Sequence, residues 1–277
     1  MTTAAVPSNG TVPTPQTTVQ LLEQLRRQAF RDAELQRVRA ACGLACDLFS
    51  GRLHAVGKPY LAHCTGAAGA AAALVADGDV VTAALLHGAY AWGDFGPWRA
   101  VLRQKRRYLR RHIGERAEGY VFGFQMLPWN TDAIGGFLAS SGQLDASART
   151  VVALRLVSEL DNLRDGSVLY RADAERVRAA LRTRGPILTE LAGRLGLPDL
   201  AAALAAEVER TFDRVVDAEL RGRLPTGTLL PPASARRRLA ATVGGALLTV
   251  ARRRRARSRA SPPPAILRTR NLPPSQN

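Results

Sequence analysis

The sequence is poor in the features that stabilise secreted proteins or carry a chain through a membrane. Its 277 residues include only three cysteines, an odd number for so long a chain, which argues against a disulfide framework. No apolar run approaches the roughly 20 residues that a membrane-spanning helix needs. The first residues, MTTAAVPSNGTVPTPQTT, lack the basic and apolar segments of a signal peptide. We therefore expect a reduced, cytoplasmic protein.

Lysine is scarce as well, because Lys58 and Lys105 are the only two and arginine supplies the rest of the basic side chains. The formal net charge is +16. Residues 226–277 contain eleven arginines and no acidic residue, which leaves a net charge of +5 for residues 1–225. The strong positive charge is therefore mainly a property of the C-terminal segment, and does not by itself indicate nucleic-acid binding by the rest of the chain.

Alternating apolar and polar residues between hairpin turns are also missing, whereas apolar residues recur at helical spacing along most of the chain. The pattern predicts an all-α fold with disordered termini. We expect a disordered Thr/Pro/Ser-rich N-terminus over residues 1–16, an all-α domain over 17–225 and a basic Arg/Pro-rich tail with a short apolar helix over 226–277.

Helices are expected in the segment from Val19 to Phe49, in GKPYLAHCTGAAGAAAALVA, and in DVVTAALLHGAY with Asp79 as its N-cap. Further helical patterns cover residues 98–111, 115–126, 172–195 and 198–222, and the helix containing LRLVSELDNLRD should end at Gly166. Residues 128–146 read as a loop.

The tail has a pattern of its own, with the apolar segment Leu239–Ala251 between arginine clusters. As a helix it would be about 20 Å long, too short to span a bilayer. It could lie on an anionic membrane surface or contact nucleic acid. The plain alternative is a frayed terminal helix with a solvated basic end.

Two histidines and one carboxylate are the strongest candidates for chemistry: His63, His87 and Asp161 lie on three separate expected helices. A helical bundle builds a metal site in its core from such side chains, and imidazole with carboxylate suits one divalent metal such as Mn, Fe, Ni or Zn. Each residue also has an ordinary alternative. A histidine on an apolar helix is more often a hydrogen-bonded core residue, and Asp161 could pair with Arg155 or Arg164.

Several segments taken together resemble the HD-domain phosphohydrolases, above all the hydrolase domain of the alarmone synthetase/hydrolases. They are SGRLHAVGKPYLAHC, DVVTAALLH, HIGERAEGYVFGF and LRLVSELDNLRD, in this order over roughly residues 35–166. The chain also resembles uncharacterised actinobacterial HD-like proteins with a G.P.L.H…LLH..Y..GDFG pattern. The resemblance implies an HD-like helical bundle in which His63 and His87 are metal ligands.

The same resemblance shows what this chain lacks. The aspartate of the HD pair falls on Gly88, and the acidic pair that follows in the alarmone hydrolases falls on Ala91 and Trp92. The last metal-binding aspartate falls on Ser158, one helical turn before Asp161. Asp94 is another candidate substitute ligand. Without a well-placed carboxylate, a metal that must activate water for phosphate-ester hydrolysis would bind weakly.

The segment RAVLRQKRRYLRR, residues 99–111, favours an anionic ligand because arginine forks suit phosphate. We expect Arg103, Arg107 and the neighbouring Tyr90 to be ligand-binding residues, most simply for a small phosphorylated ligand. The alternatives are a solvated basic helix face and, for Tyr90, packing in the core.

Two functional hypotheses remain. The first is a non-catalytic or strongly diverged HD-like protein that binds a small anionic ligand or a protein partner. The second is a metal-dependent phosphohydrolase acting on a phosphorylated small molecule or nucleotide. Convergence of His63 and His87 with Asp161 or Asp94 in the folded chain would favour a retained site.

Overall fold

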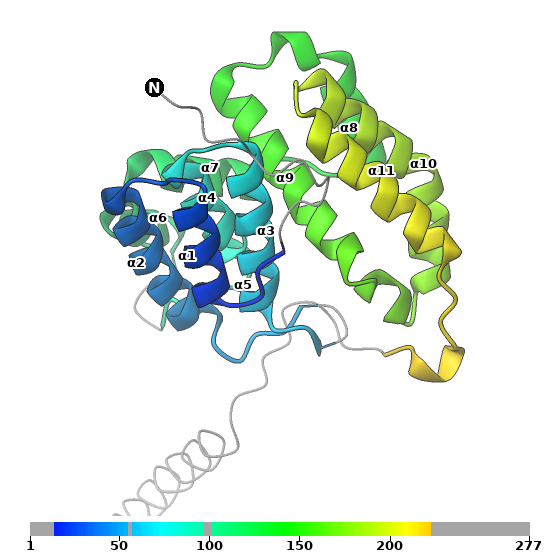
Figure 1. Ribbon diagram of the computed structural model, residues 1–277, viewed down its shortest axis with the longest axis horizontal. Helices are drawn as coiled ribbons and strands as arrows, with labels where there is room; N and C mark the ends of the chain where they lie inside the picture. The colour runs from blue at the N-terminus through cyan, green and yellow to red at the C-terminus, as the bar shows by residue number, and fades with distance from the viewer. Residues whose placement is uncertain (1–13, 55–56, 97–100, 223–277) are drawn as a thin grey trace, which may run out of the picture. The chain divides into compact units, whose positions relative to one another are not determined.

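The computed structural model describes residues 14–54, 57–96 and 101–222, and this part of the chain is all-α, as the sequence predicts. Within it, the extended pairing is limited to isolated bridges between Leu53 and Pro59 and between Arg171 and Gly222. The α-helices follow one another as α1 Thr18–Arg27, α2 Asp32–Phe49, α3 Tyr60–Leu74, α4 Gly78–Leu86, α5 Ala89–Trp92, α6 Leu102–Ile113, α7 Glu115–Met126, α8 Thr131–Ala139, α9 Ala146–Arg164, α10 Ala174–Arg194 and α11 Pro198–Asp213 (Figure 1).

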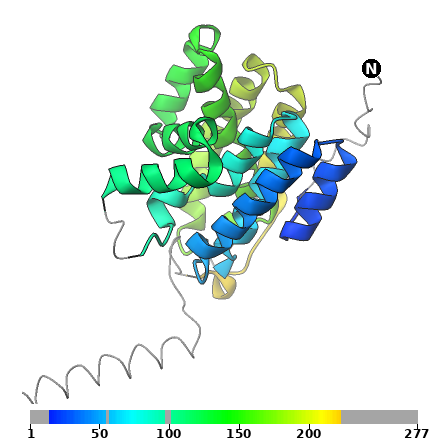
Figure 2. The same cartoon turned by 90° about the vertical axis from the view of Figure 1, so that its left-hand side faces the viewer.

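Helix α9 is the central element of the fold. It packs against α3, α4 and α7 and also against α10 and α11, so that it links the earlier helices to the later ones (Figure 1). The view turned by 90° shows α1 and α2 side by side at one edge (Figure 2). Helices α10 and α11 form an antiparallel pair joined by a short turn at Gly196, whose φ of +74° only glycine adopts freely. The candidate site lies where α3, α4 and α9 meet.

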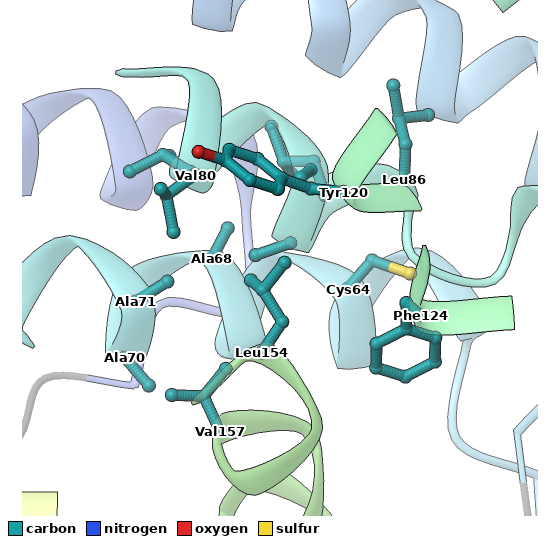
Figure 3. Packing of buried hydrophobic residues seen from close by; sticks show 14 of the residues in the cluster. Cys64, Ala68, Ala70, Ala71, Val80, Leu86, Tyr120, Phe124, Leu154 and Val157 are labelled. Atoms are coloured by element: carbon teal, nitrogen blue, oxygen red, sulfur yellow. The ribbon is translucent and has the colours of Figure 1, made fainter. Parts of the chain in front are cut away.

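Helix α3 is buried nearly all round, from Tyr60 to Ala72. Its sequence, YLAHCTGAAGAAAAL, is rich in alanine and glycine, which lets neighbouring backbones approach closely. The side chains of Leu154 and Val157 point from α9 toward the alanines of α3 (Figure 3). A helix with an apolar surface on every side belongs in the core, and this one carries His63 into it.

The helix boundaries depart from the sequence prediction in several places. A helix was expected over 198–222, but α11 ends at Asp213. The run from Val19 to Phe49 is broken into α1 and α2 at Ala29, whose φ is +57°. The N-cap of α4 is Asp77, which accepts a hydrogen bond from the backbone N–H of Asp79, so the prediction of Asp79 was wrong. The expected loop over 128–146 is also wrong, because it contains α8, capped by Asn130.

By its backbone contacts the chain divides into two units, Met1–Leu230 and Pro231–Asn277, and all the described residues belong to the first. The predicted apolar helix over Leu239–Ala251, and residues 1–13 of the segment 1–16 that was expected to be disordered, lie outside the described residues. No helix of the described part has the length and apolar character needed to cross a membrane.

Candidate functional site

The three residues singled out from the sequence come together in the core. His63 lies one turn into α3, His87 follows the last residue of α4, and Asp161 lies near the C-terminal end of α9. Each is at most 3% exposed. Buried polar groups of this kind are stable only when they are hydrogen-bonded to one another or to the backbone, and these three form one network.

The two imidazole rings are linked edge to edge. The Nδ1 atom of His63 lies 2.7 Å from Oδ2 of Asp161, and its Nε2 atom lies 3.2 Å from Nε2 of His87. On the other side of the network, Nδ1 of His87 donates to the carbonyl oxygen of Ala84 at 2.7 Å. The two Nδ1 atoms therefore each have a partner outside the pair, Asp161 and the carbonyl oxygen of Ala84, and the two Nε2 atoms face each other.

The hydrogen bonds determine where the protons lie. A carbonyl oxygen only accepts, so Nδ1 of His87 carries its proton and Nε2 is left with a lone pair. Burial first, and then the charge of His63, lower the pKa of His87 to about 3, so this ring stays neutral. The Nε2 atom of His63 can face that lone pair favourably only if it carries a proton itself. His63, which also donates to the Asp161 carboxylate, is thereby assigned as an imidazolium.

Lys58 completes the network from the turn that precedes α3. Its Nζ atom donates to Oδ2 of Asp161 at 2.8 Å and lies 2.9 Å from Oδ2 of Asp165. Burial alone would raise the pKa of Asp161, but the hydrogen bonds and charges of His63 and Lys58 outweigh it and lower that pKa. Two carboxylates thus face two cations, and the group is balanced in charge.

Glycine at position 66 is what lets α9 bring Asp161 so close to α3. A Cβ atom at Gly66 would collide with Oδ1 of Asp161. That oxygen is buried and has no hydrogen-bond partner among the described residues, whereas Oδ2 has two. The carboxylate is therefore held by one oxygen, and its position depends on the absence of a side chain at residue 66.

The HD resemblance would place an aspartate at position 88, and the space that its side chain would need is occupied by Tyr60. A Cβ atom built on Gly88 would collide with the hydroxyl and ring of Tyr60, the first residue of α3. Tyr60 is buried, and its ring lies against Phe49 with centroids 5.0 Å apart. Glycine at position 88 is thus coupled to a packed aromatic ring, which leaves no room for a longer side chain there.

A third histidine, His54, lies against this network. Its ring stacks on that of His63, with centroids 4.3 Å apart and an angle of 22° between the planes. Burial has the largest effect on the pKa of His54. Together with the charges of His63 and Lys58 it lowers that pKa to about 2. On the opposite side, the ring of Phe124 lies 4.7 Å from that of His87. Aromatic rings therefore enclose the pair and limit the access of water.

The donor atoms around the pair fit a hydrolytic metal centre poorly. Among the described residues, no three His, Cys, Asp or Glu side chains are arranged to hold a metal ion together. The physical reason is that Asp161 faces Nδ1 of His63 instead of the point between the two Nε2 atoms. Asp94, the other expected carboxylate, is exposed and accepts a hydrogen bond from the N–H of Gly96 in its own turn. The hydroxyl of Ser158 lies 3.4 Å from Nε2 of His63.

The arginines of α6 form a separate feature. Arg103 and Arg107, expected to bind a ligand, line a hollow of about 420 Å³ together with Arg106, Arg110 and Arg111. Tyr90 does not line it. Its hydroxyl instead donates to the fully buried carboxylate of Glu118, which also accepts from Arg106 and Arg110. The expectation for Tyr90 is corrected accordingly, because its hydroxyl is held in the core by Glu118.

Part of the chain matches a known protein family. Residues 47–128 match the family model described as Domain of unknown function (DUF6817). The matched region runs from the end of α2 to just beyond α7, and it contains Lys58, His63, His87 and Glu118 but not Asp161. None of the curated proteins matches the chain. The description of the family carries no activity, so the chemistry of the site has to be argued from its geometry.

Three residues of these networks were missed from the sequence. GKPYLAHC reads as a turn and a helix start, and nothing local in it shows that Lys58 reaches a carboxylate 103 positions later. Tyr60 could have been noticed as the one large aromatic beside the small residues of α3. Glu118 is the second acid, after Glu115, to follow the long basic run, and an acid so close to that run is a signal for a partner of Arg106 and Arg110 that the sequence does offer.

Proposed function

We propose that this chain is a strongly diverged HD-like helical module that binds an anionic ligand and does not catalyse phosphate-ester hydrolysis. The observation that carries the proposal is the hydrogen bond between the two Nε2 atoms of His63 and His87, 3.2 Å apart, with each Nδ1 atom engaged elsewhere. A proton in that position leaves the group of Lys58, His63, Asp161 and Asp165 neutral, whereas a divalent cation would add a net charge to a buried site.

In this proposal the former site is a structural centre. His63 ties α3 to α9 through Asp161 and to the end of α4 through His87, and Lys58 fixes the turn before α3 to the same carboxylate. Charge-assisted hydrogen bonds of this kind are short and directional. They hold the helix junction in one arrangement, and the binding surface is elsewhere, on the arginines of α6.

The arginine hollow on α6 supports the anion-binding part of the proposal. Arginine presents a planar fork of donors that matches phosphate oxygens two at a time. Arg103, Arg107 and Arg111 are exposed, and no ion pair in the described part of the chain involves them. The ligand class that fits is a phosphorylated small molecule or another phosphate-bearing surface.

A second candidate function has one observation in its favour. Two imidazoles bound to one zinc ion, each at about 2.0–2.1 Å, place their nitrogens near the separation seen between His63 and His87. If Mn, Fe, Ni or Zn occupied that position, the ion would polarise a phosphate ester and lower the pKa of bound water. The poor donor set, the buried rings and the neighbouring Lys58 all count against it.

The experiment compares the full-length protein with two matched variants. Calorimetry with pyrophosphate measures anion binding by wild type, by R103Q/R107Q and by R27Q/R39Q, which removes two exposed arginines from α1 and α2 instead. Elemental analysis after equilibration with Mn and Zn, followed by a panel of phosphate esters, tests the second candidate. We expect pyrophosphate binding that R103Q/R107Q alone weakens, and no ester hydrolysis. One equivalent of metal, lost in H87A together with an esterase activity, would overturn the proposal.

A further inference from the structure

The exposed face of α6 has an unusual density of positive charge. Its sequence, LRQKRRYLRRHI, contains five arginines and one lysine and no acidic residue. The arginines at 103, 106, 107, 110 and 111 follow the i, i+3, i+4, i+7, i+8 spacing that places side chains on one face of a helix. All five line the same hollow of about 420 Å³. A cationic surface of this form requires an anionic partner or bulk solvent.

Only part of this charge is neutralised within the protein. Glu118, fully buried on α7, accepts hydrogen bonds from Arg106 at 2.7 and 3.1 Å and from Arg110 at 2.8 Å. These bonds fix the two guanidinium groups and the orientation of α6 on α7. Arg103, Arg107 and Arg111 take part in no ion pair within the part of the chain that the structure describes. The face is therefore held rigidly and keeps an excess of positive charge.

Apolar side chains adjoin the arginines at the N-terminal end of the same helix. Val101 is 59% exposed and Leu102 is 48% exposed, although both are of the type that is normally withdrawn from water. Leu109, two turns after Leu102 on the same side of α6, is fully buried and anchors the helix to the domain, so the exposed apolar pair lies at the N-terminal end of the helix. Exposed apolar residues beside a cationic helix face are typical of helices that lie at the surface of an anionic bilayer.

Nucleic acid matches this surface less well. It would use the arginines in the same way, through its phosphates, but it provides nothing for Val101 and Leu102 to enter. Proteins that bind single strands place exposed aromatic rings among their basic residues. The one aromatic residue of α6, Tyr108, instead packs edge-on against Phe95.

We propose that α6 docks this protein onto an anionic lipid surface. Lipid phosphates occupy the hollow between the arginines, and Val101 and Leu102 enter the boundary between headgroups and acyl chains. The proposal rests on the anion binding proposed above and names its source, a lipid headgroup instead of a free phosphate. It assigns the docking to the folded domain, independently of the basic tail.

The test is the partition of the full-length protein between buffer and vesicles. Phosphatidylcholine vesicles are compared with vesicles that also contain phosphatidylglycerol, for wild type, R103Q/R107Q/R111Q, V101S/L102S and the charge-matched control R27Q/R39Q/R194Q. An arginine near an anionic surface contributes about a fivefold change in partition, so the α6 arginine variant should lose about a hundredfold. We expect V101S/L102S to lose about tenfold, with little change in the control. Circular dichroism checks that each variant is folded.

The outcomes separate the lipid from other anions. The lipid proposal requires that V101S/L102S weakens binding to vesicles but leaves binding of pyrophosphate unchanged. Equal losses in the α6 variant and in the charge-matched control would show attraction by net charge alone and overturn it. Tight binding to duplex DNA that depends on the arginines, without binding to the anionic vesicles, would assign the face to nucleic acid. Failure to bind pyrophosphate as well as vesicles would remove the proposed anion binding itself.

Discussion

Tyr60 occupies the space that a side chain on Gly88 would need. The hydroxyl and ring atoms of Tyr60 lie where the Cβ atom of residue 88 would be placed, and both residues are next to the buried histidine pair. The core is therefore packed against residue 88, and a carboxylate cannot be accommodated there by changing residue 88 alone. This coupling leads to the first prediction.

The variant G88D should destabilise the protein by about 3 kcal/mol, because it overpacks the core against Tyr60 and buries a carboxylate with no partner. Chemical denaturation of wild type and variant measures the difference. The control is G119A on α7, where a Cβ atom meets nothing within 4 Å and a helical alanine should add about 0.5–1 kcal/mol. The double variant Y60A/G88D separates the cost of the collision with Tyr60 from the cost of burying the carboxylate. If it recovers none of the stability lost in G88D after correction for Y60A, the proposed collision is wrong.

Gly66 is expected to be equally sensitive. The variant G66A places a methyl group against Oδ1 of Asp161 and must push that carboxylate away from His63 and Lys58, at a cost of about 2–3 kcal/mol. The exposed helical position Gly43, with nothing within 4 Å, provides the matched control, where alanine should stabilise. Thermal unfolding of G66A and G43A, compared with wild type, measures the two changes in stability. Equal melting temperatures for G66A and wild type would contradict the described approach of α9 to α3.

Removing the ammonium group of Lys58 should cost about 3 kcal/mol, because the K58M variant leaves Asp161 buried beside one cation instead of two. The same substitution in the background of D161N should cost much less. A double-mutant cycle measures this coupling from four denaturation curves. A coupling energy near zero would mean that the short contact between Lys58 and Asp161 contributes nothing to stability.

Stability should fall as the pH is lowered from 7 to 5. The pKa of His87 is lowered to about 3 in the folded chain, so the unfolded chain binds a proton near pH 6.5 that the folded chain does not. The stability that results is complete above about pH 6.5 and decreases toward pH 3, with a loss of about 2 kcal/mol from His87 at pH 5. Urea denaturation at several pH values, on wild type and H87Q, measures the contribution. An identical pH dependence in H87Q would show that His87 does not carry it.

The sequence was sufficient to predict the all-α class and most of the helices, since the 3.6-residue spacing of apolar residues is a local signal. It also singled out His63, His87 and Asp161, which do meet in the core. The mutual orientation of the three side chains could not be predicted from the sequence. Whether Asp161 faces Nδ1 or Nε2 of His63 depends on how closely α9 approaches α3, which is determined by Gly66. The filling of the space beside Gly88 by Tyr60 likewise depends on a contact between residues 28 positions apart.

The segment over 128–146 shows a different limit. Its many small and polar residues resemble a loop, yet Asn130 caps a helix there, and Ile134 is fully buried. Packing of α8 on α10 supplies the stability that its glycine-containing sequence lacks. The hydrogen bond from Tyr90 to Glu118 was missed for a related reason, because Glu118 lies on a helix that the local sequence does not place beside Tyr90.

The measurement that tests the central claim most directly is nitrogen-15 NMR of the histidine side chains at neutral pH, before and after addition of Zn. The account predicts that both ring nitrogens of His63 are protonated, and that a hydrogen-bond coupling connects its Nε2 atom to Nε2 of His87. It also predicts that Zn leaves these signals unchanged. Bare Nε2 atoms on both rings, with signals that shift together as one equivalent of Zn is bound, would show a metal site and contradict it.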